Sequence, residues 1–257
     1  MNKFSVSKYN SYKFFVIVFT ILTISIQPKS IAQSSNASSV IDYSIWDDLL
    51  QKHVNTKGEV DYAGFVKDKK DLNKFTDLLS KYTPKQTWTK NEKKAYLINA
   101  YNAFTIQLIV DNYPLKSIKN IGEEPFEAFK TKFINFDGKM ISLDDIEKGM
   151  LLSMGDPRVH FAVNCASYSC PKLDNKVYKP RDLDKQLDEA TSRFINSDLN
   201  IITKDDVKLS KIFEWYRSDF ENESQDLIKF INKYSRIKIE PNTAIEYLDY
   251  SWELNSI

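Results

Sequence analysis

The feature that most constrains the fold is a long helix predicted over residues 90–113. Thr89 and Glu92 form a capping box, in which each side chain accepts a hydrogen bond from a free backbone N–H at the helix start. Pro114 ends the helix, because the residue before a proline disfavours helical angles. Residues 95–110 are apolar almost all the way round, which is typical of a helix enclosed by other elements. We therefore expect a fold built around this helix.

The first 32 residues are predicted to be a secretory signal. Three lysines and no acidic residue precede an apolar run over residues 14–26, and residues 30–32 offer the small side chains that a signal peptidase requires. We place the cleavage before Gln33. The apolar run is short for a membrane span, and the alternative is an uncleaved anchor. Cleavage implies export to the periplasm or to the extracellular space.

The charge of the remaining chain excludes two classes of partner. Removal of residues 1–32 takes four of the 36 basic residues and leaves 32 basic against 35 acidic residues, a net charge of −3. This balance attracts neither nucleic acid nor an anionic membrane surface, and no later segment is apolar enough to span a bilayer. We expect residues 33–42 to be a polar tether and residues 43–257 to form a single globular domain.

Outside the long helix, the periodicity of apolar residues predicts a mixture of helices and short strands. Asp137 and Gly138 suit the turn of a β-hairpin over residues 133–141, and Ser142 with Asp145 caps the helix that follows. The expected fold class is α+β, with the central buried helix packed on a small antiparallel sheet. Further helices are expected over residues 43–50, 72–82, 142–152, 183–196, 212–220 and 225–234, and further extended segments over residues 159–165, 200–209, 237–239 and 245–248.

One short segment holds the scarcest reactive side chains, because both cysteines and one of the two histidines lie within residues 160–171. Cys165 is the candidate nucleophile, His160 the candidate general base, and Glu147 the group that would orient the base. The positions of His160 and Cys165 differ by five, an odd number, so in a regular strand the two side chains point to opposite faces. They can pair only if the chain bends before Cys165 or if another segment completes each site. The alternatives are a histidine bonded to backbone and a solvated Glu147.

Export would favour a disulfide between Cys165 and Cys170. The bridge requires a turn through residues 166–169, because an extended strand would hold the two residues too far apart. A free, activated Cys165 thiol is the alternative, and a strained bridge could alternate between the two states. Two cysteines cannot supply a structural zinc site by themselves, so we expect no metal and no cofactor.

Two amides form a second candidate set. Asn99 and Asn102 lie three residues apart on one face of the central helix, where buried amides must find partners. They either tie the helix to a neighbouring loop or contact a ligand. We assign Asn99 and Asn102 to substrate binding, together with Arg158 and Ser169.

His53 follows an amphipathic helix and is expected at the surface. Two aromatic segments are predicted to be architectural rather than reactive. In the segment over residues 215–220, Arg217 and Asp219 are expected to anchor loops, with aromatic packing around them. The segment over residues 247–252 is expected to form a closing strand.

Five short motifs follow one another along the chain. They are residues 99–103 (NAYNA), residues 113–118 (YPLKSI), residues 156–162 (DPRVHFA), residues 165–167 (CAS) with 169–171 (SCP), and residues 215–217 (WYR). Together they resemble the domain-of-unknown-function family numbered 547. The similarity runs from about residue 46 to residue 252, and the combination is specific although no single motif is. The family has no settled activity, so the resemblance implies kinship and not a reaction.

The order of a buried helix, a hairpin and a strand that begins with His160 is also similar to the transglutaminase and papain-like fold, with extra helices. In that fold, a cysteine near the start of the central helix faces a histidine on a strand. Here Asn99 or Asn102 takes the place of the cysteine, and an amide cannot act as the nucleophile. The resemblance therefore implies either a thiol relocated to Cys165 or a groove that only binds.

The chain also departs from its relatives, which commonly carry a Glu-His pair and an Arg four positions beyond that His. Lys148 and Leu152 occupy the positions of that His and Arg, so a site that depends on either would be impaired. We predict an exported thiol- or histidine-dependent hydrolase or transferase for acyl or peptide-like substrates. The alternative is a non-catalytic module that binds a small-molecule or peptide-like ligand in the same groove.

Overall fold

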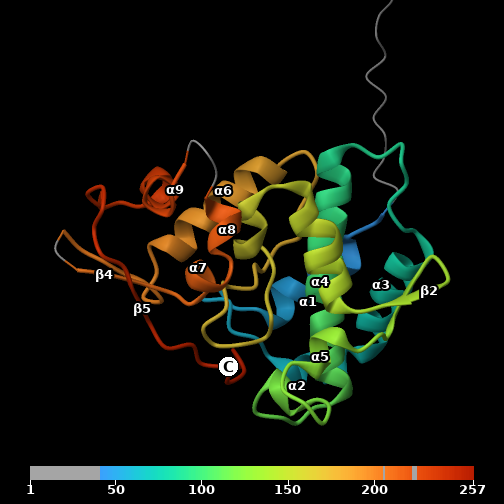
Figure 1. Cartoon of the computed structure of the whole chain (residues 1–257). Coiled ribbons are helices and arrows are strands. Elements are labelled where there is room, and N and C mark those ends of the chain that lie inside the picture. Colours follow the sequence, from blue (N-terminus) through green and yellow to red (C-terminus); the bar gives the residue numbers. More distant parts are fainter. Residues whose placement is uncertain (1–40, 205, 222–224) are drawn as a thin grey trace, which may run out of the picture. The chain divides into compact units, whose positions relative to one another are not determined.

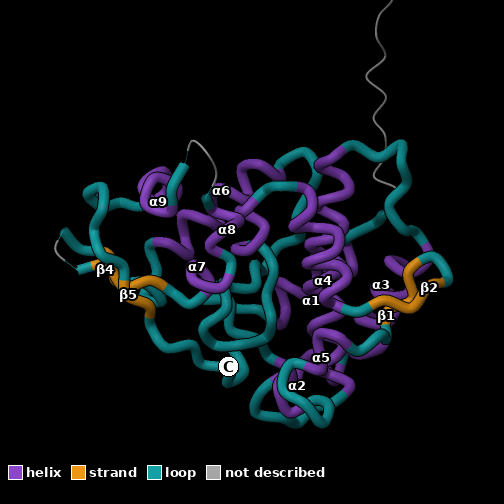
Figure 2. Tube along the Cα trace, in the orientation of Figure 1, coloured by secondary structure: helices purple, strands orange, loops and turns teal. Residues whose placement is uncertain are grey.

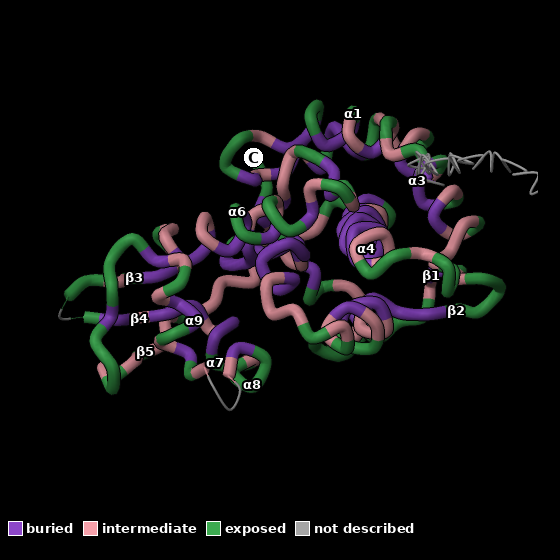
Figure 3. The backbone as a smooth tube through the Cα atoms, turned by 90° about the horizontal axis from the view of Figure 1, so that it is seen from above, coloured by how far each residue is buried: buried purple, intermediate pink, exposed green. Residues whose placement is uncertain are grey.

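Helix α4 (Lys90–Asp111) lies at the centre of one of the two groups of helices in the fold (Figure 1). In this computed structural model it packs against α2 (Tyr62–Lys67), α3 (Lys69–Lys81) and the π-helical segment η2 (Asp145–Leu151). Sixteen of its 22 residues are buried, and Figure 3 shows the helix enclosed over most of its length. The predicted capping box at Thr89 is present. The expectation of a central buried helix is therefore confirmed.

The structure describes residues 41–204, 206–221 and 225–257. The predicted signal over residues 1–32 and nearly all of the predicted tether lie outside this part. Within the part that is described, no helix combines the length and the apolar character that crossing a membrane requires.

Most of the other helices lie where the periodicity predicts them. α1 (Ser44–His53), α6 (Leu183–Ile195) and α9 (Leu227–Tyr234) match predicted helices within a few residues. The helix predicted over residues 212–220 is divided at Tyr216 into α7 and α8. The short helical pieces are α5 (Glu127–Lys130), α7 (Ile212–Trp215), α8 (Arg217–Phe220), and the 3-10 helices η1 (Ile118–Asn120), η3 (Leu152–Met154) and η4 (Pro157–Phe161).

Two small sheets lie on opposite sides of the helices (Figures 1 and 2). β1 (Ile134–Phe136) and β2 (Lys139–Ile141) form the predicted antiparallel hairpin. In the second sheet, β3 (Ile201–Ile202) pairs antiparallel with β4 (Val207–Leu209), and β4 pairs parallel with β5 (Glu246–Tyr247). The fold is therefore α+β, as predicted.

Residues 159–165 do not form the buried strand that their apolar character predicted. The Asp156 side chain accepts a hydrogen bond from the N–H of Arg158 at 3.2 Å, and Pro157 stands at the start of the 3-10 helix η4. A proline fits there because the first helical N–H has no partner within the helix. The run is nevertheless buried, so its apolar character correctly indicated burial but did not distinguish a strand from a short helix. Residues 237–239 also form no strand.

His53 is buried, contrary to the expectation of a surface position. α2 and α3 fold back against the end of α1, and the Nε2 atom of His53 lies 2.7 Å from a carboxylate oxygen of Asp68. Phe65 packs on the imidazole with a distance of 4.8 Å between ring centroids. Gly64 permits this packing, because a Cβ atom at that position would overlap the His53 ring. The place of His53 at the end of an amphipathic helix therefore did not reveal that α2 and α3 bury it.

Two hydrophobic clusters make up the core. The larger surrounds α4 and includes Tyr101 and Phe129. The smaller is built from α6, α7, α8 and α9, and a group of phenylalanine rings around Phe161 fills its interior. η4 links the two clusters, because Val159 belongs to the larger and Phe161 to the smaller. His160 lies within η4, and both cysteines follow it within nine residues.

Candidate functional site

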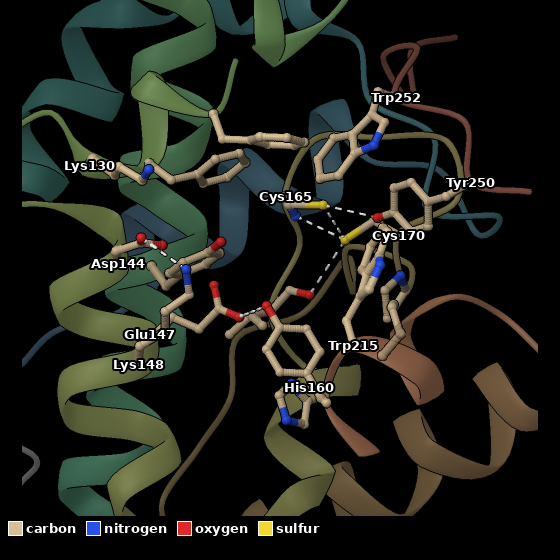
Figure 4. A pocket seen from close by; sticks show the side chains of 17 residues that line it. Lys130, Asp144, Glu147, Lys148, His160, Cys165, Cys170, Trp215, Tyr250 and Trp252 are labelled. Atoms are coloured by element: carbon tan, nitrogen blue, oxygen red, sulfur yellow. Dashed lines mark hydrogen bonds and ion pairs between the residues drawn. The ribbon is translucent and has the colours of Figure 1, made fainter. Parts of the chain in front are cut away.

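A cavity of about 470 Å³ is lined by residues of both hydrophobic clusters. Its wall contains both cysteines, Glu147 and His160. Figure 4 shows the cysteines at one end of the cavity and Glu147 with Lys148 at another. Seven of the 17 residues that line the wall are aromatic: Tyr101, Phe126, Phe129, Trp215, Tyr216, Tyr250 and Trp252. Such a cavity suits a ligand with an apolar or aromatic group.

Cys165 and Cys170 lie on one turn, and both are free thiols with sulfur atoms 2.8 Å apart. The N–H of Cys170 donates to the carbonyl of Ser167 at 3.1 Å, and Ala166 adopts a left-handed conformation with φ of 60°. The N–H of Cys165 points at the sulfur of Cys170, 3.0 Å away. Cys165 is partly exposed on the cavity wall, whereas Cys170 is buried. The turn through residues 166–169, which is needed to bring the sulfurs of Cys165 and Cys170 together, is therefore present.

The C-terminal segment runs beside this turn. The N–H of Tyr168 donates to the carbonyl of Glu253 at 2.7 Å. The hydroxyl of Ser169 accepts a hydrogen bond from the N–H of Ser251 at 2.9 Å. Ser169 was expected to contact substrate, but it does not line the cavity and instead fixes the C-terminal segment against the cysteine turn.

Three groups surround the sulfur of Cys165 at hydrogen-bonding distance: the Cys170 sulfur at 2.8 Å, the Ser167 hydroxyl at 3.1 Å and the Tyr250 hydroxyl at 3.3 Å. Burial alone would raise the pKa of the Cys165 thiol, but these hydrogen bonds outweigh burial and lower that pKa below its ordinary value. Burial, and then the hydrogen bond to Cys165, raise the pKa of Cys170 well above its ordinary value. One sulfur therefore favours the thiolate, and its neighbour keeps the proton.

Glu147 is buried on η2, and its carboxylate accepts a hydrogen bond from the Tyr216 hydroxyl at 3.2 Å. Burial raises the pKa of Glu147, against hydrogen bonds from Tyr101 and Tyr216 that lower it. The carboxyl group is therefore biased towards its protonated form, in which it can donate a proton. Lys148 pairs with Asp144 at 2.9 Å, and its charge lowers the pKa of Glu147 by less than the two tyrosine hydrogen bonds do.

The partner of His160 is Asp219 and not Glu147. The Nε2 atom of His160 lies 2.8 Å from a carboxylate oxygen of Asp219, and the Tyr216 ring packs on the imidazole with 4.2 Å between centroids. Burial lowers the pKa of His160, against Asp219, which raises it. Figure 4 shows the imidazole and Cys165 at different ends of the cavity. η4 is a helix and not a strand, so it turns His160 towards α8, and the predicted grouping of His160, Cys165 and Glu147 is not formed as a hydrogen-bonded set.

Asn99 and Asn102 each bind backbone with both ends of the amide. Asn99 donates to the carbonyl of Tyr178 at 2.8 Å and accepts from its N–H at 3.1 Å. Asn102 donates to the carbonyl of Ala162 at 2.9 Å and accepts from the N–H of Asn164 at 2.8 Å. Neither amide lines the cavity. This placement corresponds to the alternative in which the two amides tie the helix to neighbouring loops. Asn102 holds the residues that directly precede the cysteine turn.

Arg158 also lies away from the cavity. Its guanidinium group bonds to Asp156 at 2.9 Å, to Asp184 at 2.8 Å and to Asp188 at 2.9 Å, and so ties η4 to α6. Lys94 of α4 pairs with the same Asp156 carboxylate. Arg158 therefore belongs to an ionic network that fixes helices, in place of the expected substrate contact.

Residues 85–195 match the family described as "Protein of unknown function, DUF547". This part of the chain belongs to the DUF547 family. The DUF547 segment contains α4, Glu147, His160 and both cysteines, so the family resemblance in the sequence is confirmed. No curated protein and no solved structure matches the chain significantly, and the likeness to the papain-like fold stays a prediction.

Three contributors to the site lie after the matched DUF547 segment and were not predicted: Tyr216, Asp219 and Tyr250. Their signal in the sequence was the pair of aromatic segments over residues 215–220 and 247–252, which predicted loop anchors with aromatic packing and a closing strand. Within the described ranges 41–204, 206–221 and 225–257, no three His, Cys, Asp or Glu residues are grouped so that they could hold a metal ion.

Proposed function

We propose that the aromatic cavity is the active site of a thiol-dependent hydrolase or transferase, with Cys165 as the nucleophile. The observation that carries this proposal is the surroundings of the Cys165 sulfur. Cys165 is a partly exposed residue on the cavity wall, and the hydroxyls of Ser167 and Tyr250 lie 3.1 Å and 3.3 Å from its sulfur. The thiolate is the reactive form of cysteine, and hydrogen bonds to the sulfur favour that form.

The expected substrate is an acyl or peptide-like compound with an apolar group, because seven aromatic side chains line the cavity. The Cys165 thiolate would attack the carbonyl carbon, so that an S–C bond forms and the bond to the leaving group breaks. Glu147, biased towards its protonated form, would give its proton to the leaving group. Water or an acceptor molecule would then cleave the thioester, return a proton to Glu147 and regenerate the thiolate.

The test is acylation by p-nitrophenyl esters of increasing acyl length. The reduced protein should release one p-nitrophenolate per molecule in a burst and gain the acyl group on Cys165, as mapped by peptide mass. Cys165→Ser should lose the burst while its thermal unfolding stays close to that of the unaltered protein. Tyr168→Phe is a matched surface control, since Tyr168 is exposed beside the turn. An unchanged burst in Cys165→Ser would exclude Cys165 as the nucleophile.

One observation favours the second candidate, a non-catalytic binding module. The Nε2 atom of His160 is held by Asp219, which leaves the thiol without the histidine contact of papain-like enzymes. A binding module should quench the fluorescence of Trp215 and Trp252 when an apolar peptide or acyl compound enters the cavity, equally in Cys165→Ser. Quenching without any acyl adduct, over all ester lengths, would favour this candidate.

Export remains a separate proposal and rests on the sequence over residues 1–32. Expression of the full chain in a bacterial host, followed by cell fractionation, should recover a shortened protein outside the cytoplasm. Its N-terminal sequence should begin at Gln33. Recovery of the uncut chain in the cytoplasmic fraction would contradict the proposal.

A further inference from the structure

The two cysteines of the turn differ in burial and in the surroundings of their sulfur atoms. Cys165 is partly exposed on the cavity wall, and Cys170 is buried behind it with 7% of its surface exposed. The sulfur of Cys165 lies 3.1 Å from the hydroxyl of Ser167 and 3.3 Å from that of Tyr250. The N–H of Cys165 points at the sulfur of Cys170, 3.0 Å away.

We infer that this turn is a thiol–disulfide exchange pair, in which Cys165 attacks a disulfide bound in the aromatic cavity and Cys170 resolves the product. The inference rests on the proposed function in one respect, because it uses the same nucleophile. The expected substrate is the disulfide of a small or peptide-like thiol, with an apolar group that the aromatic wall can hold.

The reaction balances with that disulfide as the oxidant. The Cys165 thiolate attacks one substrate sulfur, forms a mixed disulfide and releases the other half as a thiolate. Cys170 then loses its proton to the released thiolate and attacks the Cys165 sulfur. The second half of the substrate leaves as a thiolate, which takes a proton from water. The two cysteines have lost two electrons, and the substrate disulfide has become two thiols.

The surroundings of the sulfurs favour this division of roles. The pKa of Cys165 is lowered by its hydrogen bonds in spite of burial, so this sulfur on the cavity wall favours the attacking thiolate. Burial first, and then Cys165, raise the pKa of Cys170, so the inner sulfur keeps its proton until the mixed disulfide forms. At 2.8 Å the resolving sulfur is already in contact with the sulfur that it must attack.

The turn is also held at both ends, so the sulfurs stay together. The carbonyl oxygen of the Asn164 side chain accepts a hydrogen bond from the N–H of Ala166 at 2.9 Å, and its amide donates to the carbonyl of Pro171 at 2.8 Å. One side chain therefore spans the turn from its start to its end. Such preorganisation makes resolution an intramolecular step with a high effective concentration.

The experiment uses the reduced full-length protein and glutathione disulfide as the probe, with intact mass and peptide mapping as the readout. The unaltered protein should lose two hydrogens and link Cys165 to Cys170, with little mixed disulfide. Cys170→Ser should stop at one glutathione attached to Cys165. Cys165→Ser should react at least about tenfold more slowly, because its remaining thiol is buried and protonated. Urea unfolding of each variant establishes that it is folded.

Three results would overturn the inference. Cys170 in Cys165→Ser could become glutathionylated as fast as Cys165 does in Cys170→Ser. The unaltered protein could form no bond between Cys165 and Cys170 at any ratio of glutathione disulfide to glutathione, or Cys170→Ser could accumulate no mixed disulfide. If a serine variant does not fold, the alanine variant replaces it. Ester acylation of the same samples separates this inference from the proposed function. Exchange without acylation leaves the inference standing alone, and acylation without exchange removes it.

Discussion

The phenolic hydroxyl of Tyr250 lies 3.3 Å from the sulfur of Cys165, although 85 residues separate them in the sequence. The contact exists because the chain end pairs with the cysteine turn through backbone hydrogen bonds, among them that from Tyr168 to Glu253. The same hydroxyl lies 2.8 Å from that of Ser167, which also contacts the sulfur. The last residues of the chain therefore form part of the surroundings of its most reactive thiol.

Replacement of Tyr250 by Phe should make Cys165 less reactive. The change removes one hydrogen bond to the thiolate and keeps the ring, so the pKa of Cys165 should rise. At about pH 7 the rate of alkylation by iodoacetamide should fall roughly two- to tenfold, as the loss of one hydrogen bond implies. Tyr168→Phe, in an exposed tyrosine beside the same turn, should leave the rate unchanged. Equal rates in the two variants would show that Tyr250 does not stabilise the thiolate.

Replacement of Asn102 by Ala should destabilise the protein strongly. The Asn102 amide satisfies the buried carbonyl of Ala162 and the buried N–H of Asn164, and both would lose their partner. The free energy of unfolding should fall by about 2–4 kcal/mol, measured by urea denaturation. Asn112→Ala, at the end of the same helix, removes a partly buried bond to Leu108 and should cost less than about 1 kcal/mol. Similar losses would mean that the loop before the cysteines does not depend on Asn102.

Replacement of Asp156 by Asn should destabilise the protein in a pH-dependent way. Burial alone would raise the pKa of Asp156, but hydrogen bonds from Arg158 and Lys94 outweigh it and hold that pKa well below its ordinary value. A carboxyl group with a depressed folded pKa stabilises the fold above its unfolded value, and this contribution is lost as the pH falls towards the folded value.

At neutral pH, Asp156→Asn should therefore lose about 3–5 kcal/mol, because the buried Lys94 ammonium keeps no carboxylate partner there. The difference from the unaltered protein should shrink as the pH falls below about 4. Asp71→Asn removes an exposed pair with Lys74 and should change the free energy of unfolding by less than about 1 kcal/mol at any pH. A difference that does not vary with pH would contradict the assignment.

Replacement of Glu147 by Gln should change the free energy of unfolding in the opposite direction and stabilise the protein. Burial raises the pKa of Glu147, so its ionised form destabilises the fold at high pH, and protonation relieves that effect as the pH falls. The amide oxygen of Gln can still accept the hydrogen bond from Tyr216. Glu147→Gln should be more stable than the unaltered protein at about pH 8, and the difference should vanish near pH 4. Glu189→Gln, on the exposed face of α6, should show no such trend.

Local signals in the sequence were sufficient for α4, for its capping box and for the hairpin of β1 and β2. These features depend on neighbouring residues: Thr89 caps an N–H only three positions away, and a turn joins two strands that follow each other. The close approach of the two sulfurs is of the same kind, since only residues 166–169 lie between them. The sequence could predict each of these because short chains have few ways to close.

The partners within the site depended on the tertiary structure. Asp219 in place of Glu147 beside His160, and Tyr250 beside Cys165, are contacts across 59 and 85 residues. The run over residues 159–165 had the composition of a strand or of a short buried helix, and the cap at Asp156 selected the helix and turned His160 towards Asp219. By itself the sequence determined which side chains carry the chemistry. Packing between distant segments decided which of these side chains meet. The apolar pattern of a sequence predicts that a side chain is buried, but it does not predict which distant side chain lies beside it.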